Sequence, residues 1–359
     1  MTVEKKLINK KPFIERQAKD HKIPLAYSSP ISVNGEFAKG EYQIPLATTE
    51  RGLVAGINRG CKAVTEAGGV VARIYKKGFT RAPGFQANNI EEAVGFYRWV
   101  IAYGNEVLSW PEAQSRHIHL IEVKPFIAGK NIFLRMRFDC GDSMGGNSVT
   151  ILSDRISRRL AKERNIEYLT VSSNVCADKK PSAINVLDNR GFGVITGVLL
   201  SAGVITNILK TSADKLSRLS SVKHGIGSAF SGAPYHQNSH VANTLAAIYI
   251  ACGQDVAQIV ESSAGFFSIE TLEANAAYAT LTLPSLEVGV HGGGTEYETA
   301  RYELDHLGCK VILGQTGRAA AIFAEIVASI CLAAEISLLA VLAEGALAEV
   351  SARLGRAKY

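Results

Sequence analysis

The fold is decided by one long apolar stretch, which runs from Ala319 to Val350 and reads AAAIFAEIVASICLAAEISLLAVLAEGALAEV. Its charged residues are all acidic: Glu325, Glu335, Glu344 and Glu349. A helix that spans a membrane needs about 20 mostly uncharged residues in a row. Because the glutamates interrupt every such run, the stretch predicts a buried core helix and no membrane segment.

The composition is that of a globular protein with a large core or with about two domains. The chain has 359 residues, of which 47% are hydrophobic and 20% are charged. The net charge is +6 and the basic residues are scattered along the chain. This pattern does not favour a nucleic-acid partner, whereas an anionic small ligand or an acidic protein partner fits it.

The cysteines and the N-terminal segment bear on the cell compartment. The six cysteines are widely spaced and form no C-x-x-C pair, which is not the pattern of a disulfide scaffold or a structural zinc site. The first residues, MTVEKKLINKKPF, are charged and contain no apolar segment. We therefore expect no signal peptide and predict a cytoplasmic protein.

Hydrophobic periodicity predicts a helix over residues 52–68 and strands over 41–45 and 70–75. The stretch from Pro83 to Val171 has a different texture, with these expected elements: a helix over 91–103, a β-hairpin over 117–138 that turns at 128–131, a helix over 148–160 and a strand over 168–172. A hairpin bracketed by two helices inside a larger chain predicts a compact inserted domain.

A glycine-rich segment, Asp139 to Asn147 (DCGDSMGGN), lies between the expected hairpin and the following helix. Glycines there allow backbone N–H groups to approach a phosphate, and a helix N-terminus adds positive potential. The alternative is an ordinary strand-to-helix turn that is capped by Asn147 or Ser148. The usual G-x-G-x-x-G fingerprint is absent from this segment, so a nucleotide bound here would not sit in a standard Rossmann fold.

Three charged groups occur in largely uncharged surroundings. Asp178, Lys179 and Lys180 form one of them, which is either a solvated loop or a place where a lysine polarises a carbonyl oxygen. Asp255 follows a very apolar run, so it must cap a helix or pair with a remote residue. Glu50 follows two threonines that could cap the next helix. Together with two glycine-rich elements, these groups fit carbonyl reduction by a nicotinamide cofactor.

Two further patterns carry less weight. His236 and His240 are four residues apart, a spacing that binds metals on a helix, but no third ligand is near in the sequence and we expect no metal. Gly292, Gly293 and Gly294 indicate a flexible loop or a site of close backbone approach.

Seven segments in order along the chain are similar to those of the 3-hydroxy-3-methylglutaryl-CoA reductase family. They are PLATTE (45–50), NRGCKA (58–63), GDSMGGN (141–147), DKKPSAIN (178–185), HVAN (240–243), residues 247–258 and LPSLEVGVHGGGT (283–295). The resemblance covers most of the chain.

This resemblance implies an α+β fold. A large domain for substrate binding and dimerisation, residues 1–82 and 175–359, packs around a long central helix. A small ferredoxin-like domain inserted over residues 83–174 binds NADPH or NADH. The family also implies a homodimer or a dimer-based oligomer whose active sites are built from both subunits, and a small-molecule acyl substrate.

By position in the family motifs, Glu50 is the expected proton donor, Lys179 stabilises the developing oxyanion, and Asp255 bonds between them. The residues expected to bind the substrate are Arg81, Ser172, Asp178, Lys180, Lys223, His240 and Asn243. Those expected to bind the cofactor are Asp142, Ser143, Met144, Gly145, Gly146, Asn147, Gly292 and Gly293.

One departure from the family bears on the substrate. The family's C-terminal histidine, which protonates the departing CoA thiolate, falls at about Leu354, and no histidine follows His306. Either another acid such as His240 replaces it, or the substrate is not a CoA thioester. Our first prediction is an NAD(P)H-dependent reductase of a thioester or carbonyl in a 3-hydroxy-acyl-type substrate that need not carry CoA.

Three alternatives remain open from the sequence. The chain can be an authentic hydroxymethylglutaryl-CoA reductase that makes mevalonate, or a catalytically silent family member that acts as a binding partner. A third hypothesis makes Cys176, close to Lys179 in the sequence, a nucleophile that cleaves the thioester.

Overall fold

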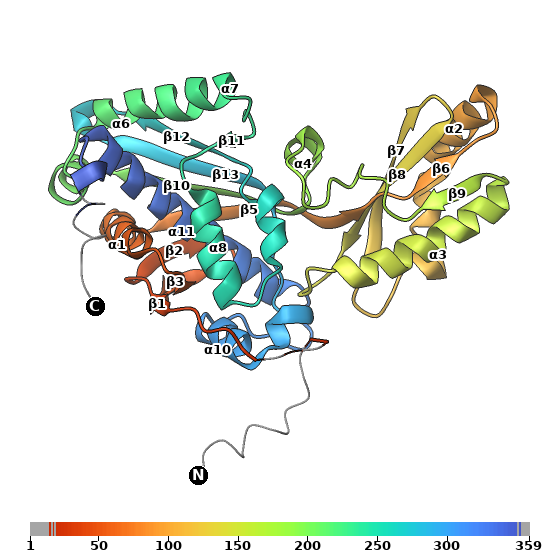
Figure 1. The fold of residues 1–359 in the computed structure, drawn as a ribbon, viewed down its shortest axis with the longest axis horizontal. Coiled ribbons are helices and arrows are strands. Elements are labelled where there is room, and N and C mark those ends of the chain that lie inside the picture. The colour runs from red at the N-terminus through yellow and green to blue at the C-terminus, as the bar shows by residue number, and fades with distance from the viewer. Residues whose placement is uncertain (1–13, 16, 18, 350–351, 353–359) are drawn as a thin grey trace, which may run out of the picture.

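The computed structural model describes residues 14–15, 17, 19–349 and 352. They form a larger lobe and a smaller lobe that a long strand, β5, connects (Figure 1). The N-terminal segment used above to predict the compartment, and position 354, lie outside the described residues.

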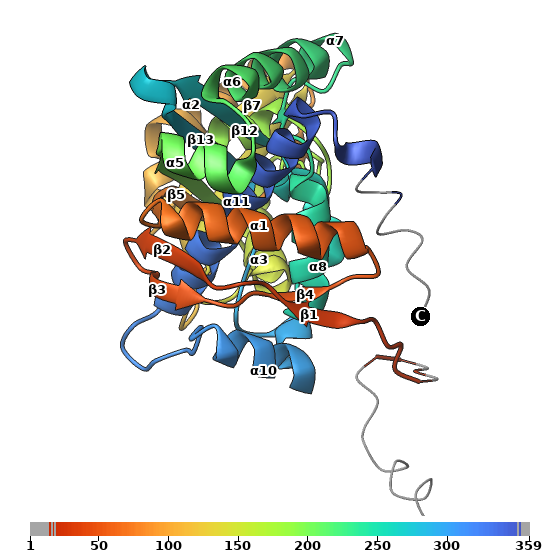
Figure 2. The same ribbon diagram turned by 90° about the vertical axis from the view of Figure 1, so that its left-hand side faces the viewer.

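The larger lobe contains most of the elements. Its strands are β1 (Leu25–Tyr27), β2 (Ile31–Gly35), β3 (Lys39–Tyr42), β4 (Pro45–Ala47), β5 (Val70–Arg81), β10 (Gly191–Leu200), β11 (His236–Gln237), β12 (Gly265–Thr271) and β13 (Ala277–Leu286). Its helices are α1 (Arg51–Glu66), α4 (Ala183–Asp188), α5 (Ala202–Val204), α6 (Ala213–Ser220), α7 (Ser228–Phe230), α8 (Val241–Ala251), α9 (Ile259–Ser262), α10 (Glu298–His306) and α11 (Arg318–Ala343), with π-helical turns at Ile205–Leu209 and Ser221–Gly227. Figure 2 shows β1 to β4 lying below α1 on one side of this lobe.

The predicted core helix is α11, which packs against α1, α6 and α8 and against the sheet strands β10, β13 and β5. Among the described residues it is the one helix that could span a membrane by length and composition, but 78% of its most apolar 18-residue segment is buried inside the protein. It therefore forms the centre of the larger lobe's hydrophobic core.

The glutamates of α11 are structural anchors. Glu325 accepts hydrogen bonds from three consecutive backbone N–H groups, those of residues 36–38 in the β2–β3 turn, at 2.7–3.0 Å. Glu335 accepts two, from Ser239 and His240, both at 2.7 Å. Burial raises the pKa of both carboxyls. A buried carboxylate requires such partners, so each glutamate ties a remote loop to the core helix.

The smaller lobe has the ferredoxin-like arrangement. Its elements in chain order are β6 (Gly84–Gln86), α2 (Ile90–Val107), β7 (His119–Ala128), β8 (Asn131–Asp139), α3 (Gly146–Arg164) and β9 (Glu167–Thr170). The strands pair in the antiparallel order β9-β6-β8-β7, and both helices contribute to a second hydrophobic cluster. The predicted α+β fold with a ferredoxin-like unit is confirmed.

Strand β5 joins the two lobes into one sheet. Its first residues pair with β10 and β2 in the larger lobe, and Phe79–Arg81 pair with β8 in the smaller lobe. The sequence predicted this strand only to Tyr75. It continues because residues 76–78 still pair with β10 and residues 79–81 pair with β8. Lys76 and Lys77 also each find a carboxylate, that of Asp188 at 3.2 Å and that of Asp139 at 2.7 Å.

The predicted strand over 41–45 is divided between two strands. β3 ends at Tyr42, and a separate strand, β4, begins at Pro45 and pairs with β1. Proline has no N–H to continue the ladder from the preceding strand, so it stands at the start of a new one.

Candidate active site

The charged loop at residues 178–180 holds a lysine in an unusual conformation. Lys179 has φ 55°, the left-handed region that side chains other than glycine rarely adopt. Its backbone N–H donates to Glu261 Oε1 at 2.9 Å, and its Nζ lies 2.8 Å from Asp255 Oδ2. The hydrogen bond with Asp255 raises the pKa of Lys179, so the ammonium stays charged at neutral pH.

Asp255 fulfils both of the roles that the sequence left open. Its Oδ1 accepts from the N–H of Ala257 at 3.1 Å and caps a short 3₁₀ turn, while its Oδ2 pairs with Lys179. Both oxygens of its carboxylate are thus hydrogen-bonded, which fixes the direction in which Oδ2 contacts Lys179.

Asp178 is the centre of the predicted substrate group. Its Oδ1 accepts from Arg190 Nη2 at 2.8 Å and from Gln258 Nε2 at 3.0 Å, and Arg81 Nη1 lies 3.4 Å from Oδ2. Although burial opposes it, the charge of Arg190 and the bond from Gln258 hold the pKa of Asp178 below its usual value. Lys180 Nζ donates to the backbone carbonyl of Asp178 at 3.0 Å.

Ser172 lies next to Cys176, with its Oγ 3.5 Å from the Sγ. Burial works against ionisation of the thiol, but the Ser172 contact and the backbone of Asp178 lower the pKa of Cys176. The thiol is buried, so the structure offers no exposed nucleophile at this position.

Glu50 forms a second group with Asn243. Its exposed carboxylate accepts from Asn243 Nδ2 at 2.9 Å, at the position immediately before α1. Thr48 Oγ1 accepts from the N–H of Glu50 itself at 3.0 Å and does not cap α1. Within the described chain Glu50 makes no hydrogen bond or ion pair with Lys179 or Asp255, so the three catalytic candidates lie in two groups.

The histidine pair does not have helical spacing. His236 belongs to β11, whereas His240 stands at the N-terminus of α8, with Nε2 3.0 Å from the carbonyl oxygen of Ala334. The idea of a helical metal pair is therefore wrong, and the described residues contain no group of three or more His, Cys, Asp or Glu side chains suited to a metal ion. Lys223 is half-buried in the π-helical turn beside His224, whose pKa falls to about 4 through burial and the nearby lysine.

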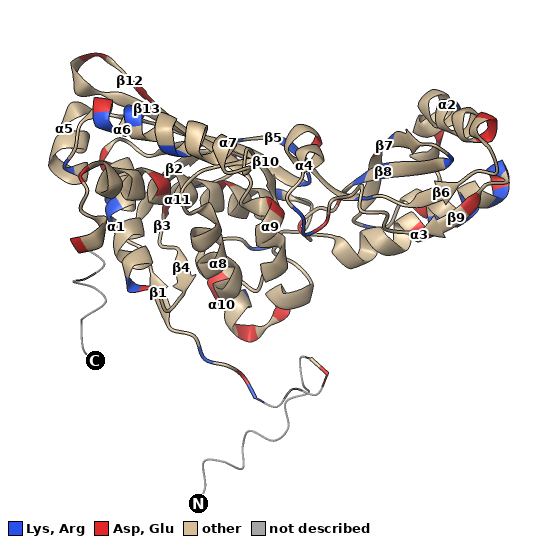
Figure 3. Cartoon of the chain, turned by 45° about the horizontal axis from the view of Figure 1, so that its top comes forward, with Lys and Arg blue, Asp and Glu red and all other residues tan. Residues whose placement is uncertain are grey.

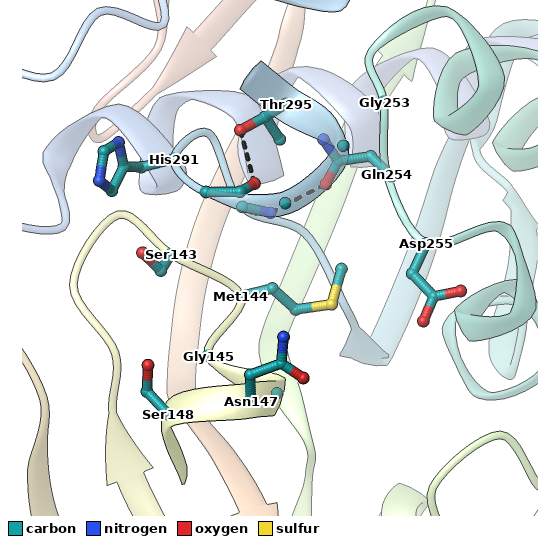
Figure 4. Close-up of a pocket in the computed structure, with 15 residues that line it drawn as sticks. Ser143, Met144, Gly145, Asn147, Ser148, Gly253, Gln254, Asp255, His291 and Thr295 are labelled. Atoms are coloured by element: carbon teal, nitrogen blue, oxygen red, sulfur yellow. Dashed lines mark hydrogen bonds between the residues drawn. The ribbon is translucent and has the colours of Figure 1, made fainter. Parts of the chain in front are cut away.

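A cavity of about 350 Å³ lies between the predicted cofactor loop and Asp255 (Figure 4). It is lined by Ser143, Met144, Gly145, Gly146, Asn147, Ser148, Gly253, Gln254, Asp255, Gly289, His291, Gly292, Gly293, Gly294 and Thr295. The first six come from the smaller lobe and the rest from the larger lobe. Asp255 lines this cavity while holding Lys179, so a ligand here lies beside the charged pair.

The glycines of this cavity suit an anionic group. Gly145, with φ 102°, immediately precedes α3, and no side chain caps the helix. The predicted cap by Asn147 or Ser148 is therefore wrong, because both residues lie inside the helix. Gly146, Asn147 and Ser148, the first residues of α3, line the cavity. The N–H groups of a helix's first turn have no partner within the helix, which is what a phosphate site requires. Gly292 and Gly293 have left-handed φ values, and an added Cβ on either would meet open space.

Asp142 lies outside the cavity lining. Its buried carboxylate accepts from the N–H groups of Gly317 at 2.9 Å and Ala320 at 3.1 Å, at the N-terminus of α11. The structure thus uses Asp142 to fix the cofactor loop to the core helix.

Sequence reasoning missed several residues around the site. His291 lines the cavity and lies 3.3 Å from Glu296, and its place directly before three glycines could have marked it. Arg190, Glu261 and Glu287 are fully buried beneath the loop, and nothing in their sequence context indicates burial.

The chain matches the family model described as Hydroxymethylglutaryl-coenzyme A reductase over residues 4–356. The chain belongs to the hydroxymethylglutaryl-coenzyme A reductase family. A relative from Pyrococcus abyssi named 3-hydroxy-3-methylglutaryl-coenzyme A reductase is 42% identical over 93% of this chain and 82% of its own length. One of the same name from Aeropyrum pernix is 41% identical over 93% of this chain and 79% of its own.

The fold of this reductase-family chain is also found in solved structures. A class II 3-hydroxy-3-methylglutaryl-CoA reductase from Streptococcus pneumoniae, bound to NADPH in open conformations, superposes with a TM-score of 0.72 over 92% of this chain and 87% of that one, at 18% identity. Family membership confirms the predicted enzyme class, an NAD(P)H-dependent reductase.

Proposed function

We propose that the chain is an authentic hydroxymethylglutaryl-CoA reductase, which reduces the thioester to mevalonate with NADPH or NADH. The observation that carries this proposal is the 2.8 Å contact of Lys179 with Asp255 at the edge of the cavity lined by the glycine loop. Relatives named for this reaction, at about 40% identity over most of the chain, support the choice of substrate.

The first prediction from the sequence, a substrate that need not carry CoA, is set aside in favour of this alternative. It rested on a histidine missing near residue 354, but the match covers only 82% of the length of the Pyrococcus relative. The end of this sequence therefore gives no argument about the substrate. His240 is also a poor replacement acid, because its Nε2 is engaged with the backbone of α11.

The roles proposed for the chain's own residues follow from the geometry. Lys179, kept charged by Asp255, would donate to the substrate's carbonyl oxygen and stabilise the negative charge that develops there. Glu50 would supply the proton to that oxygen. The cationic side chains of Arg81, Lys180 and Lys223 are proposed to bind the acid end of the acyl group, together with Ser172, His240 and Asn243.

The cavity fits a nicotinamide dinucleotide. The uncapped N-terminus of α3 suits the phosphates, and the open faces of Gly292 and Gly293 allow a flat group to approach the backbone. Ser143 to Asn147 are proposed to hold the cofactor, which when bound supplies hydride to the carbonyl carbon.

We further propose a homodimer in which the partner subunit unites the Glu50 group with the Lys179 group. Three apolar side chains, Val222, Ile226 and Phe230, are 58%, 67% and 92% exposed at four-residue spacing, and such a stripe is typical of an interface. Phe230→Asp is expected to shift the sedimentation coefficient from that of a dimer to that of a monomer. An unchanged coefficient contradicts this choice of interface.

The two hydrophobic clusters support the proposed division into a substrate domain, residues 1–82 and 175–359, and a cofactor domain, residues 83–174. The relatives of known name are consistent with a soluble, cytoplasmic enzyme, which we retain as part of the proposal.

The test is a steady-state assay of the purified protein with hydroxymethylglutaryl-CoA and each nicotinamide cofactor. We expect two equivalents of cofactor to be oxidised for each free thiol released. Lys179→Met should lower kcat by about 10³-fold, with the cofactor affinity measured by fluorescence unchanged.

Other outcomes separate the alternatives. Turnover with a free aldehyde or ketone but none with the CoA thioester would restore the substrate without CoA. Failure to bind either cofactor in calorimetry would favour the catalytically silent family member.

A further inference from the structure

A fully buried arginine lies directly beneath the catalytic loop. Arg190, immediately before β10, has no exposed surface. Its Nη2 lies 2.8 Å from Asp178 Oδ1, and its Nε lies 2.7 Å from Glu287 Oε1 and 3.4 Å from Glu261 Oε1. The guanidinium also stacks on the ring of Phe79 at 3.8 Å.

This cluster is costly to bury. Burial and the neighbouring carboxylates raise the pKa of Glu287 to about 8, and burial also raises that of Glu261. Buried ionic groups of this kind are often replaceable by apolar side chains without loss of stability. A contribution to stability is therefore a weak explanation for the cluster, and its contacts point to another.

The cluster contacts the catalytic loop at two successive residues. Arg190 holds the side chain of Asp178, and Glu261 accepts the backbone N–H of Lys179 at 2.9 Å. Lys179 occupies the left-handed region, which costs free energy for a residue with a side chain unless its surroundings hold it there. The same oxygen of Glu261 faces both Lys179 and Arg190, so one guanidinium fixes the backbone from which the ammonium reaches Asp255.

We infer that Arg190 and Glu261 are positioning residues that hold the Lys179 backbone in its left-handed conformation and thereby set the contact between the ammonium and Asp255. Neither touches the substrate in this scheme. The inference rests on the proposed function only in making that contact important for catalysis.

The direct test measures the coupling between Lys179 and Asp255 without any turnover. The lysines are reductively methylated with ¹³C, the Lys179 signal is assigned with Lys179→Arg, and its pKa is followed by NMR. Asp178, Asp255 and Glu261 are the carboxylates that raise this pKa. Asp255→Asn should lower it in the otherwise native protein.

The same Asp255→Asn substitution is then made in three backgrounds. In Glu261→Leu, which removes the acceptor of the Lys179 N–H, we expect Asp255→Asn to change the Lys179 pKa little, because the ammonium no longer contacts Asp255. Arg190→Lys is a second variant, which keeps the buried charge but cannot reach two carboxylates at once. In this background too, Asp255→Asn should change the Lys179 pKa little. Glu325→Leu is the matched control, since Glu325 is also a buried acceptor of backbone N–H groups but is remote from the loop. In the Glu325→Leu background, Asp255→Asn should lower the Lys179 pKa as much as it does in the native protein.

Kinetics give an independent readout. Glu261→Leu should lower kcat at least tenfold with the KM for the cofactor unchanged, and Glu261→Gln, which keeps an acceptor oxygen, should recover most of it. The inference would be overturned if Asp255→Asn lowered the Lys179 pKa in both Glu261→Leu and Arg190→Lys as much as it does in the native protein. If the native protein does not turn over hydroxymethylglutaryl-CoA, the proposed function fails, while the NMR titration still decides the positioning role.

Discussion

Glu287 is a residue whose surroundings set its protonation. It is fully buried, and desolvation together with the charges of Glu261 and Asp178 raises its pKa to about 8 against the attraction of Arg190. In the unfolded chain its pKa returns to that of an ordinary glutamate, about 4.3. The folded state therefore binds a proton between these values that the unfolded state releases, so its contribution to stability is present at low pH and is lost as the pH rises through 8.

Glu287→Gln mimics the protonated form permanently. We expect the variant to be close to the native protein in stability at pH 5 and more stable at pH 9, by at least about 1 kcal/mol, since one pKa unit corresponds to about 1.4 kcal/mol. Urea unfolding at both pH values measures the difference. A constant difference between the two proteins across this range would contradict the raised pKa.

The residues of the site differ in how far the sequence could reveal them. Lys179 and Asp255 were predicted because they follow family motifs, and the structure brings them together although they are remote in sequence. Arg190 and Glu261 were not predicted, because pairing between residues 71 positions apart leaves no local pattern. Asp142 was predicted as a cofactor residue, but burial required its carboxylate to find N–H donors, and it found them on α11.

At the scale of elements, α11 and the cofactor loop are coupled through that carboxylate. Asp142 supplies the negative charge that a helix N-terminus attracts, and it bonds two of the N–H groups left unpaired there. The loop that begins at Asp142 then continues into the glycines before α3. The same residue therefore stabilises the core helix and fixes one wall of the cavity.

Asp142→Asn should lower the free energy of unfolding by about 1 kcal/mol, the usual value of a cap, and weaken the binding of reduced cofactor several-fold. Thermal unfolding and cofactor fluorescence measure the two effects. Asp154→Asn is the control for cofactor binding, because Asp154 pairs with the exposed Arg158 and accepts from Tyr168, within the smaller lobe, and should leave the cofactor affinity unchanged. If Asp142→Asn binds the cofactor with unaltered affinity, the contact of Asp142 with α11 does not set the conformation of the loop.

Element boundaries were predictable where one periodicity dominates. The helices and the hairpin of the smaller lobe follow the predicted ranges closely, because amphipathic spacing and a glycine turn act locally. The full length of β5 was not predictable, since its last residues remain extended only by pairing with β8. That pairing joins residues more than fifty positions apart, so no local pattern reveals it.

At the scale of the molecule, the two lobes meet around one carboxylate. Asp188, at the end of α4, accepts from Arg135 Nε at 3.0 Å, lies 3.0 Å from Arg137 Nη2, and also pairs with Lys76 and Lys124. Both arginines belong to β8 of the smaller lobe. Figure 3 shows basic and acidic residues gathered where the lobes join. The segment that contains Asp188 follows the loop of Asp178 to Lys180, so this junction connects the smaller lobe to the Lys179–Asp255 pair.

Asp188→Asn should be among the more destabilising single substitutions in the chain. It would leave Arg135, which is 1% exposed, without its carboxylate partner and Arg137, which is 3% exposed, with Glu122 as its remaining one, and breaking a buried ion pair in this way costs about 3 kcal/mol. The cationic neighbours hold the pKa of Asp188 below its usual value despite its burial. Its contribution is therefore present at neutral pH and is lost as the pH falls below the ordinary aspartate value of about 3.9.

Calorimetric unfolding at pH 7 and at pH 3 measures this contribution. The gap between the native protein and Asp188→Asn should be large at pH 7 and should narrow at pH 3. Glu163→Gln, which removes an exposed partner of Arg159, is the control and should show a small gap at both pH values. If Asp188→Asn unfolds like the native protein at pH 7, the charged junction does not hold the lobes together, and the shared strand β5 and the bonds of Asp142 to α11 hold them instead.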